Sequence, residues 1–156
     1  MANAMSDTQP DFEQTLSALR AQVDGKLDQW LPQCSAHDLI GAAMRDGTLA
    51  PGKRIRPLLL LLAIKDLQRE RAFEAALDLA CALEMVHAAS LFLDDMPCMD
   101  NAELRRGRPT IHLQFGEDVA VLGSVALLTH AFSIAASVDG GGRSQRNQLV
   151  QLLAQA

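Results

Sequence analysis

Apolar residues recur at helical spacing near the start of the chain. Between residues 11 and 31 they stand three or four positions apart, at Phe12, Leu16, Leu19, Val23, Leu27 and Trp30. This spacing places them on one face of an α-helix, and Pro32 ends it because proline does not continue a helix. The pattern predicts an amphipathic helix over residues 11–31, after a flexible lead-in over residues 1–10.

Capping and turn residues define the next segment. Ser35 or Asp38 can open a short helix that ends at residue 44 or 45, since both residue types cap helices well. The pairs Asp46-Gly47 and Pro51-Gly52 favour turns, so a loop is predicted there.

Longer helical patterns fill most of the remaining chain. They are predicted over residues 57–67, 72–94 or 95, 117–137 and, after a flexible glycine loop at 140–142, over 145–156. The second half of the 72–95 helix is apolar almost all round, which predicts burial at the centre of the domain. Gly123 and its alanine neighbours would allow close helix approach, either within the chain or to a second subunit. No segment alternates as a strand does, so the fold is predicted to be all-α.

Composition narrows the function classes. The 156 residues suit one domain, and the net charge of −5 disfavours a nucleic-acid partner. Cys34, Cys81 and Cys98 form no CxxC pair, which disfavours zinc and a disulfide framework and suits a reducing cytoplasm. Cys81 lies in an apolar run and is predicted to be a packed core thiol.

Targeting and membrane signals are weak. The first residues carry neither a basic region nor an apolar run, so no signal peptide is expected. The stretch 119–136 is nearly long enough to cross a bilayer, but Ser124, Thr129, His130 and Ser133 interrupt it. A buried helix is therefore predicted there, without stable membrane insertion.

Asp94, Asp95 and Asp100 are the most informative residues. Adjacent carboxylates at the carboxyl end of an apolar helix repel one another and are opposed by the helix dipole. A divalent cation would offset that cost, and Mg²⁺ prefers carboxylate and phosphate oxygens. Pro97 disfavours helical geometry at the residue before it, so the chain can bend and return Asp100 towards Asp94. The alternative is a solvated acidic helix end.

Polar residues lead up to these aspartates along one face of the helix. His87, Ser90 and Asp94 stand at positions i, i+3 and i+7, which favours a pocket wall over a satisfied core histidine.

Two basic clusters flank the acidic site. They are PGKRIRP, with Lys53, Arg54 and Arg56, and LRRGRPT, with Arg105, Arg106 and Arg108. Arginine matches phosphate oxygens in a bidentate manner. Either cluster alone could be ordinary solvated charge, but together with the aspartates they indicate a magnesium-bridged diphosphate.

The combination PGKRIRP and EMVHAASLFLDDMPCMDNAELRRGRPT resembles the trans-isoprenyl (polyprenyl) diphosphate synthases. The resemblance runs from about residue 52 to residue 132 and is strongest to bacterial farnesyl and geranylgeranyl diphosphate synthases. It implies a helical bundle of the isoprenoid synthase type and a prenyltransferase activity. In that reaction an allylic diphosphate ionises, isopentenyl diphosphate attacks the carbocation, and a proton is lost.

The resemblance also implies residue roles. Asp94 and Asp100 would bind Mg²⁺, with Asp95 in support, and Arg105 would contact the allylic diphosphate. Four residues would hold the diphosphate of isopentenyl diphosphate: Lys53, Arg56, His87 and Arg106. Arg54 and Arg108 would add only positive field.

Product length follows from the same resemblance. The residue five before the first aspartate helps to set the depth of the product tunnel, and here it is the small Ala89, followed by Ser90. This implies a C15–C20 product, with C20 geranylgeranyl diphosphate favoured.

Family members are about twice as long, and this sequence has no paired aspartates after Asp100. Residues 11–156 are therefore expected to be the amino-terminal half of one synthase domain, which would self-associate as a homodimer and show little or no turnover alone. A non-catalytic subunit or fragment that pairs with a full-length synthase is the alternative. A terpene cyclase is disfavoured, because a cyclase needs no second diphosphate site of the PGKRIRP type.

Overall fold

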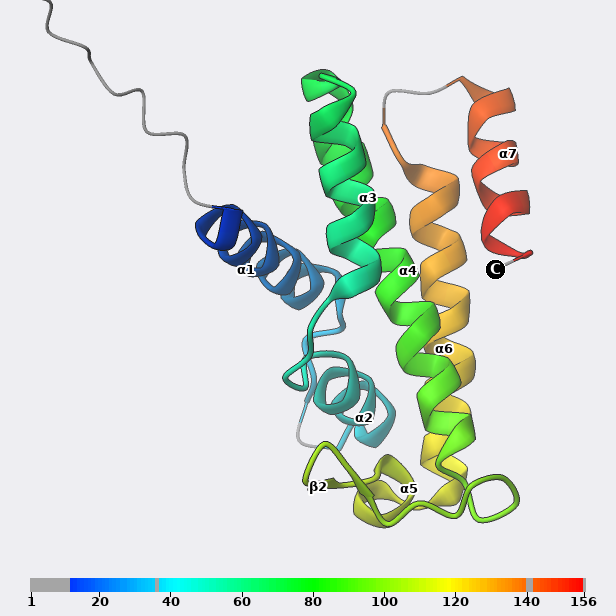
Figure 1. Ribbon diagram of the computed structural model, residues 1–156. Helices are drawn as coiled ribbons and strands as arrows, with labels where there is room; N and C mark the ends of the chain where they lie inside the picture. Colours follow the sequence, from blue (N-terminus) through cyan, green and yellow to red (C-terminus); the bar gives the residue numbers. More distant parts are fainter. Residues whose placement is uncertain (1–11, 36, 140–141, 156) are drawn as a thin grey trace, which may run out of the picture.

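The computed structural model describes residues 12–35, 37–139 and 142–155 (Figure 1). Its longer helices are α1 (Phe12–Trp30), α2 (Leu39–Thr48), α3 (Ile55–Asp66), α4 (Phe73–Asp94), α6 (Glu117–Ser137) and α7 (Arg143–Leu153). Two short helices, η1 (Glu70–Ala72) and α5 (Ile111–Phe115), and two short strands, β1 (Leu104–Arg105) and β2 (Arg108–Pro109), complete the described part. The all-α prediction is confirmed, since the strands form only a small antiparallel hairpin.

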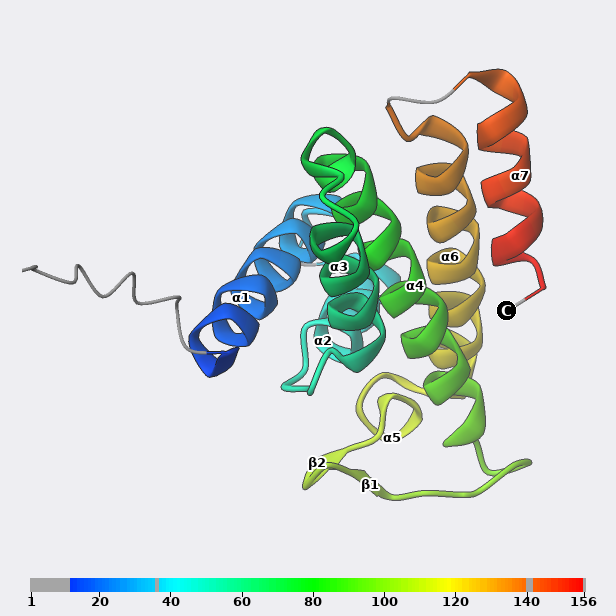
Figure 2. The same ribbon diagram turned by 45° about the horizontal axis from the view of Figure 1, so that its top comes forward.

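Helix α4 lies at the centre, as its apolar pattern predicted. It runs alongside α6 and α3, and α1 packs across it, while α7 lies beside α6 (Figures 1 and 2). Helix α2 and α5 lie near the end of α4 that carries the aspartates, with the hairpin next to them (Figure 2). The fold therefore places the LRRGRPT segment at the carboxyl end of α4, through Arg105 and Asp95, and the PGKRIRP segment further back along α4, through Arg54 and Glu84.

Helix α1 buries the face that its apolar spacing predicted. Leu19, Val23 and Leu27 are at most 2% exposed, whereas Phe12 at the first turn is 62% exposed. Trp30 at the other end donates from Nε1 to Asp78 on α4, over 2.8 Å. The predicted lead-in over residues 1–10 lies outside the described residues, as do the predicted first residue of this helix, two of the three loop glycines and Ala156.

The predicted loop at Asp46-Gly47 is wrong, because α2 continues through both residues to Thr48. Asp38 caps the helix by accepting a hydrogen bond from the Gly41 amide over 2.8 Å. Of the two predicted starts, Ser35 and Asp38, the structure has the second. The helix has room only for glycine at position 47, because the ring of Phe92 from α4 lies against it: a methyl group there would stand 2.5 Å from Phe92 Cζ. Tertiary packing has overridden a local turn signal.

Helix α6 has the predicted bounds, and its glycine packs inside the chain. A methyl group on Gly123 would stand 3.3 Å from Phe92 Cε2, so the close approach is to α4 of the same chain. By length and composition alone, the segments Glu70–Asp94 and Glu117–Ser137 could each cross a membrane. Within the domain, however, Leu127 and Ala131 are fully buried, so α6 contributes to the core as predicted.

Cys81 is the core thiol that its apolar surroundings predicted. It is fully buried, and burial raises the pKa of its thiol to about 12. Cys34, Cys81 and Cys98 are all free thiols.

Candidate functional site

The chain turns back on itself directly after α4. We call residues 94–102 the aspartate loop. The Asp100 amide donates to the Asp94 carbonyl over 2.9 Å, and the Ala102 amide donates to the Asp95 carbonyl over 3.2 Å. Asn101 has a left-handed backbone with φ of 49°, which reverses the chain direction. The loop therefore has the bend that Pro97 suggested, and the backbones of Asp94 and Asp100 lie side by side.

The three carboxylates have different surroundings. Asp95 is 4% exposed, whereas Asp94 is half-buried and Asp100 is exposed. Within the described residues, neither Asp94 nor Asp100 forms a salt bridge, and no group of three His, Cys, Asp or Glu is arranged to hold a metal ion. Two carboxylates are thus open to solvent, and one is used inside the protein.

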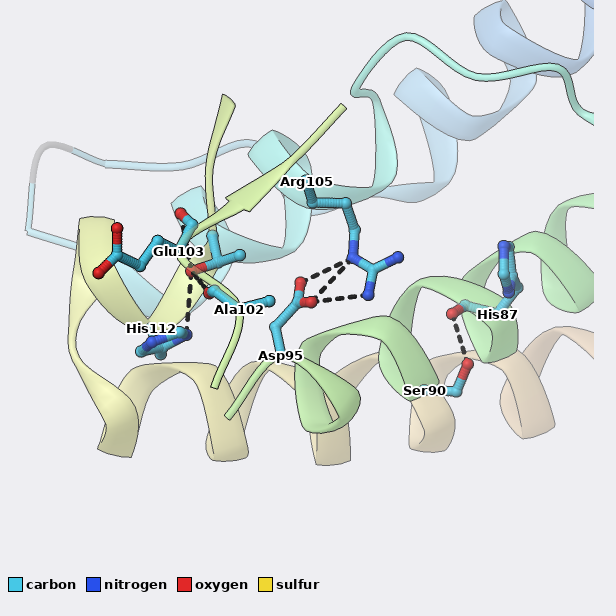
Figure 3. Close-up of polar contacts among 8 residues, drawn as sticks. His87, Ser90, Asp95, Ala102, Glu103, Arg105 and His112 are labelled. Carbon is cyan, nitrogen blue, oxygen red and sulfur yellow. Dashed lines mark hydrogen bonds and ion pairs between the residues drawn. The ribbon is translucent and has the colours of Figure 1, made fainter. Parts of the chain in front are cut away.

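Asp95 is used by Arg105 of the hairpin. Arg105 Nε lies 2.8 Å from Asp95 Oδ2, and Nη2 lies 2.6 Å from Oδ1, in a bidentate ion pair (Figure 3). The hydrogen bond to Asp95 raises the pKa of Arg105, and the nearby Asp94 and Asp100 carboxylates raise it further. Arg105 thus ties the hairpin to the end of α4 and adds a positive charge close to the two open carboxylates.

The PGKRIRP segment divides its cations between the core and the surface. Arg54 is 5% exposed and has a left-handed backbone, with φ of 52°. It donates to Asp24 over 2.7 Å and to Glu84 over 2.9 Å, so it joins α1 to α4. Lys53 and Arg56 are exposed. Arg54 is therefore a structural cation, whereas the side chains of Lys53 and Arg56 are open to solvent.

The second basic cluster is divided in a similar way. Arg108 pairs with Asp46 of α2 over 2.5 Å. Arg106 is exposed and donates to the Pro51 carbonyl over 2.8 Å. Gly52 leaves room for this contact, because a methyl group there would stand 2.5 Å from an Arg106 guanidinium nitrogen. Arg106 thereby connects the hairpin to the PGKRIRP segment.

His87 lies on α4 within the field of these cations. Burial lowers its pKa, and Arg56 and then Arg106 and Arg105 lower it further against the opposing effect of Glu84. Ser90 is exposed and donates to the His87 carbonyl over 2.8 Å (Figure 3). The predicted polar stripe of His87, Ser90 and Asp94 is present at the surface of α4.

Ala89 faces the opposite way. It is 1% exposed, and its carbonyl accepts a hydrogen bond from the Ser124 hydroxyl of α6 over 3.0 Å. Ser124, which had counted only as an interruption of an apolar run, is fully buried and joins the two central helices at this point.

A small cavity of about 90 Å³ lies where α2, α4 and the hairpin meet. Arg105, Arg106 and Arg108 line it together with Asp46 and Asp95. The open Asp94, Asp100 and His87 are outside its lining, so the predicted site residues lie around the end of α4 and are not enclosed in one pocket.

The open carboxylates suit a hard divalent cation. Mg²⁺ is commonly bound through one or two carboxylates, with water and phosphate oxygens completing its shell. Asp94 and Asp100 supply two carboxylates from backbone segments that lie side by side. The nearby Arg105 would suit a phosphate group bound to the same ion.

Several residues of the site were not identified from the sequence. They are Asp24, Asp46, Glu84, Ser124, Thr110 and His112. Glu84 could have been found, because a glutamate in an apolar helix calls for a buried cation.

Comparison with known proteins gives a consistent answer. The profile of the polyprenyl synthetase family matches residues 37–156. A geranylgeranyl diphosphate synthase from Pantoea ananas is 58% identical over 138 residues, which are 88% of this chain and 46% of the relative. A farnesyl diphosphate synthase from Geobacillus stearothermophilus is 40% identical over 150 residues, 95% of this chain and 50% of the relative.

Solved structures agree. The crystal structure of an FPP/GFPP synthase from Zymomonas mobilis matches with a TM-score of 0.84 and 35% identity, over 91% of this chain and 51% of that one. A geranylgeranyl pyrophosphate synthetase from Geoglobus acetivorans matches with a TM-score of 0.81 and 31% identity, over 90% of this chain and 44% of that one. The chain spans about half the length of the curated relatives it matches. On the family profile, the sequence identities and the shared fold, the chain belongs to the polyprenyl synthetase family.

Proposed function

We propose that this chain provides the diphosphate-binding part of a prenyltransferase that condenses an allylic diphosphate with isopentenyl diphosphate in a magnesium-dependent reaction. The observation that carries the proposal is the aspartate loop. Its backbone bond joins Asp100 to Asp94, and both carboxylates are left open beside Arg105. The names of the relatives support the reaction class.

The two diphosphates would occupy different sides of Arg105. Asp94 and Asp100 would hold Mg²⁺, which when bound supplies positive charge to the oxygens of the allylic diphosphate. Arg105, oriented by Asp95, would contact the same diphosphate. The second diphosphate would bind to Lys53, Arg56, His87 and Arg106. The exposure of Lys53, Arg56 and Arg106, and the lowering of the His87 pKa by Arg56 and Arg106 in addition to burial, support this grouping.

Ala89 and Ser90 are proposed to set product length in the C15–C20 range, with C20 favoured. Ala89 is a small, buried residue of α4, and the hydrogen bond from Ser124 holds α6 against its backbone. Replacement of Ala89 by a larger residue should shorten the product. We place the protein in the cytoplasm, with free thiols as support.

A homodimer is the proposed assembly. Val121, Leu122 and Val125 are 40%, 51% and 54% exposed on α6, and an apolar stripe of this kind favours a partner surface.

The chain alone is proposed to bind diphosphates weakly and to have little or no turnover, which is supported by its span of half the relatives' length. The test is a product assay with both substrates and Mg²⁺, on the mass-verified chain alone and after co-expression with the unmatched half of the Pantoea ananas relative. C20 product is expected only in the second case, and Asp94→Asn should abolish it. A co-expressed, stably associated pair that binds neither Mg²⁺ nor diphosphates and forms no product would refute the function.

A non-catalytic subunit is the second candidate. One relative, 53% identical over 98 residues, is named as the large subunit of a heterodimeric geranylgeranyl pyrophosphate synthase. Mixing this chain with a complete synthase separates the two candidates. A changed product ratio that survives Asp94→Asn in this chain would favour the subunit.

A further inference from the structure

Thr110 stands at the N-cap of α5, but its hydroxyl does not cap the helix. A capping threonine accepts a hydrogen bond from a backbone amide two or three positions later. Here Oγ1 lies 2.8 Å from the Ala102 carbonyl oxygen and 3.0 Å from His112 Nδ1. Thr110 is 2% exposed and His112 is 7% exposed, so two buried polar side chains are committed to the end of the aspartate loop.

The direction of each bond follows from the groups present. The Ala102 carbonyl has no proton, so the Thr110 hydroxyl donates to it. The hydroxyl has no second proton, so it accepts from His112, which must carry its proton on Nδ1. The result is a relay of two hydrogen bonds, from His112 to Thr110 and from Thr110 to Ala102.

Ala102 passes this restraint to the aspartates. Its amide donates to the Asp95 carbonyl over 3.2 Å, and two residues earlier the Asp100 amide donates to Asp94 over 2.9 Å. The Thr110 amide also donates to the Glu103 carbonyl over 3.1 Å. Figure 3 shows His112, Ala102 and Glu103 gathered to one side of the Asp95–Arg105 pair. Helix α4 holds the start of the loop, and Thr110 holds its end.

We propose that Thr110 and His112 form a clasp that positions Asp94 and Asp100 for binding of a magnesium–diphosphate group. The inference rests on the proposed function and deepens it. Both are positioning residues, since they act on the loop through Ala102.

The test uses two matched pairs of variants in the whole chain. Thr110→Val keeps the shape and removes the hydroxyl, while Thr110→Ser keeps the hydroxyl. His112→Phe removes the donor, while His112→Asn keeps an N–H near Nδ1.

Calorimetry measures the Kd of inorganic pyrophosphate with saturating Mg²⁺, and hydrogen exchange follows the Asp100 and Ala102 amides. Thr110→Val and His112→Phe should weaken binding about tenfold, the effect of one lost buried hydrogen bond, and should speed exchange at both amides. Thr110→Ser and His112→Asn should stay within about threefold of the parent.

Ile134→Val is the control for general destabilisation, because Ile134 is a core residue of α6 that is 1% exposed. It should lower Tm and leave the Kd unchanged. An equal loss of affinity in Ile134→Val and Thr110→Val would overturn the clasp, as would unchanged Kd and exchange in Thr110→Val. If the parent chain shows no measurable pyrophosphate binding, exchange alone decides the clasp, and unchanged rates at Asp100 and Ala102 refute it. The proposed function is then decided separately, by the product assay on the co-expressed pair. Should Thr110→Val not fold, the two His112 variants make the same comparison.

Discussion

Gly47 of α2 and Phe92 of α4 fit each other without room for one methyl group. A Cβ atom on Gly47 would stand 2.5 Å from Phe92 Cζ. On the other side of the ring, Gly123 of α6 leaves a gap that a Cβ would narrow to 3.3 Å. Phe92 is 3% exposed and stands two residues before Asp94, where the aspartate loop begins. The two glycines therefore let α2 and α6 pack closely against the end of α4 that carries the loop.

Gly47→Ala should therefore destabilise the protein in spite of alanine's better helix propensity. Overpacking of this kind costs about 1–3 kcal/mol, and urea unfolding would measure it. Phe92→Leu in the same chain should recover part of the loss, because it removes the ring atoms that clash.

Gly25→Ala is the matched control, since a Cβ at this helical glycine of α1 would meet nothing within 4 Å. It should stabilise by about 0.5–1 kcal/mol. A Gly47→Ala variant as stable as Gly25→Ala would contradict the packing.

Replacement of Arg54 by Met should cost far more than replacement of an exposed arginine. Arg54 and Glu84 have side chains that are 4% and 7% exposed, and removal of one partner leaves a buried charge alone. The expected loss of unfolding free energy is about 3–5 kcal/mol. The double variant Arg54→Met with Glu84→Leu should recover part of it.

Arg45→Met is the comparison, because Arg45 pairs with the 54%-exposed Asp28. Such a pair contributes about 0–1 kcal/mol. Chemical denaturation of all three variants gives the answer, and similar losses for Arg54 and Arg45 would disprove the structural role of Arg54.

The adjacent Asp94 and Asp95 should separate binding from stability. Asp94 stands at the negative end of α4, so Asp94→Asn should leave stability unchanged or raise it by about 0.3–1 kcal/mol. The same change should abolish magnesium–pyrophosphate binding. Asp95→Asn should instead lower stability by about 1–3 kcal/mol, because it weakens the bidentate pair with Arg105. Calorimetry and urea unfolding on both variants test this, and destabilisation of Asp94→Asn as large as that of Asp95→Asn would count against it.

His87 should make stability depend on pH in slightly acidic solution. Burial and then Arg56 hold its pKa below the ordinary value of 6.5, so the unfolded chain binds more protons in that region. The part of the unfolding free energy that comes from neutral His87 is therefore fully present above about pH 6.5, and it is lost as the pH falls through the lowered pKa. His87→Gln should flatten the rise in unfolding free energy between about pH 5 and 7. An unchanged slope in that variant would show that other groups cause the rise.

Much of the fold was predictable because its helices bury apolar residues at regular spacing. That spacing predicted the buried face of α1. The central place of α4 followed instead from a second half that is apolar almost all round, and α6 from its long apolar run. The bend of the aspartate loop also followed from Pro97. The extension of α2 through Gly47 did not, because it depends on a ring that is 45 positions away in sequence.

Which basic residues are buried in ion pairs and which are exposed could not be predicted from the local sequence either. Arg54 is as basic as Arg56, and only the positions of Asp24 and Glu84 decide which is buried. The hydrogen bond from Thr110 to Ala102 could not be predicted either. Thr110 stands where an ordinary capping residue would, and its acceptor is a backbone carbonyl, a group that every residue has.

The left-handed turn at Arg54 has a consequence for how this segment can vary. Lys53 and Arg54 are neighbours that point to different destinations, one to solvent and one into the interface of α1 and α4. With the chain held at α2, insertion of a single residue between Pro51 and Lys53 would move Lys53 into the place of Arg54, driving an ammonium group into the core and freeing the guanidinium. Sequence length in this short stretch is therefore under tighter constraint than its loop character suggests, and drift there should proceed by substitution.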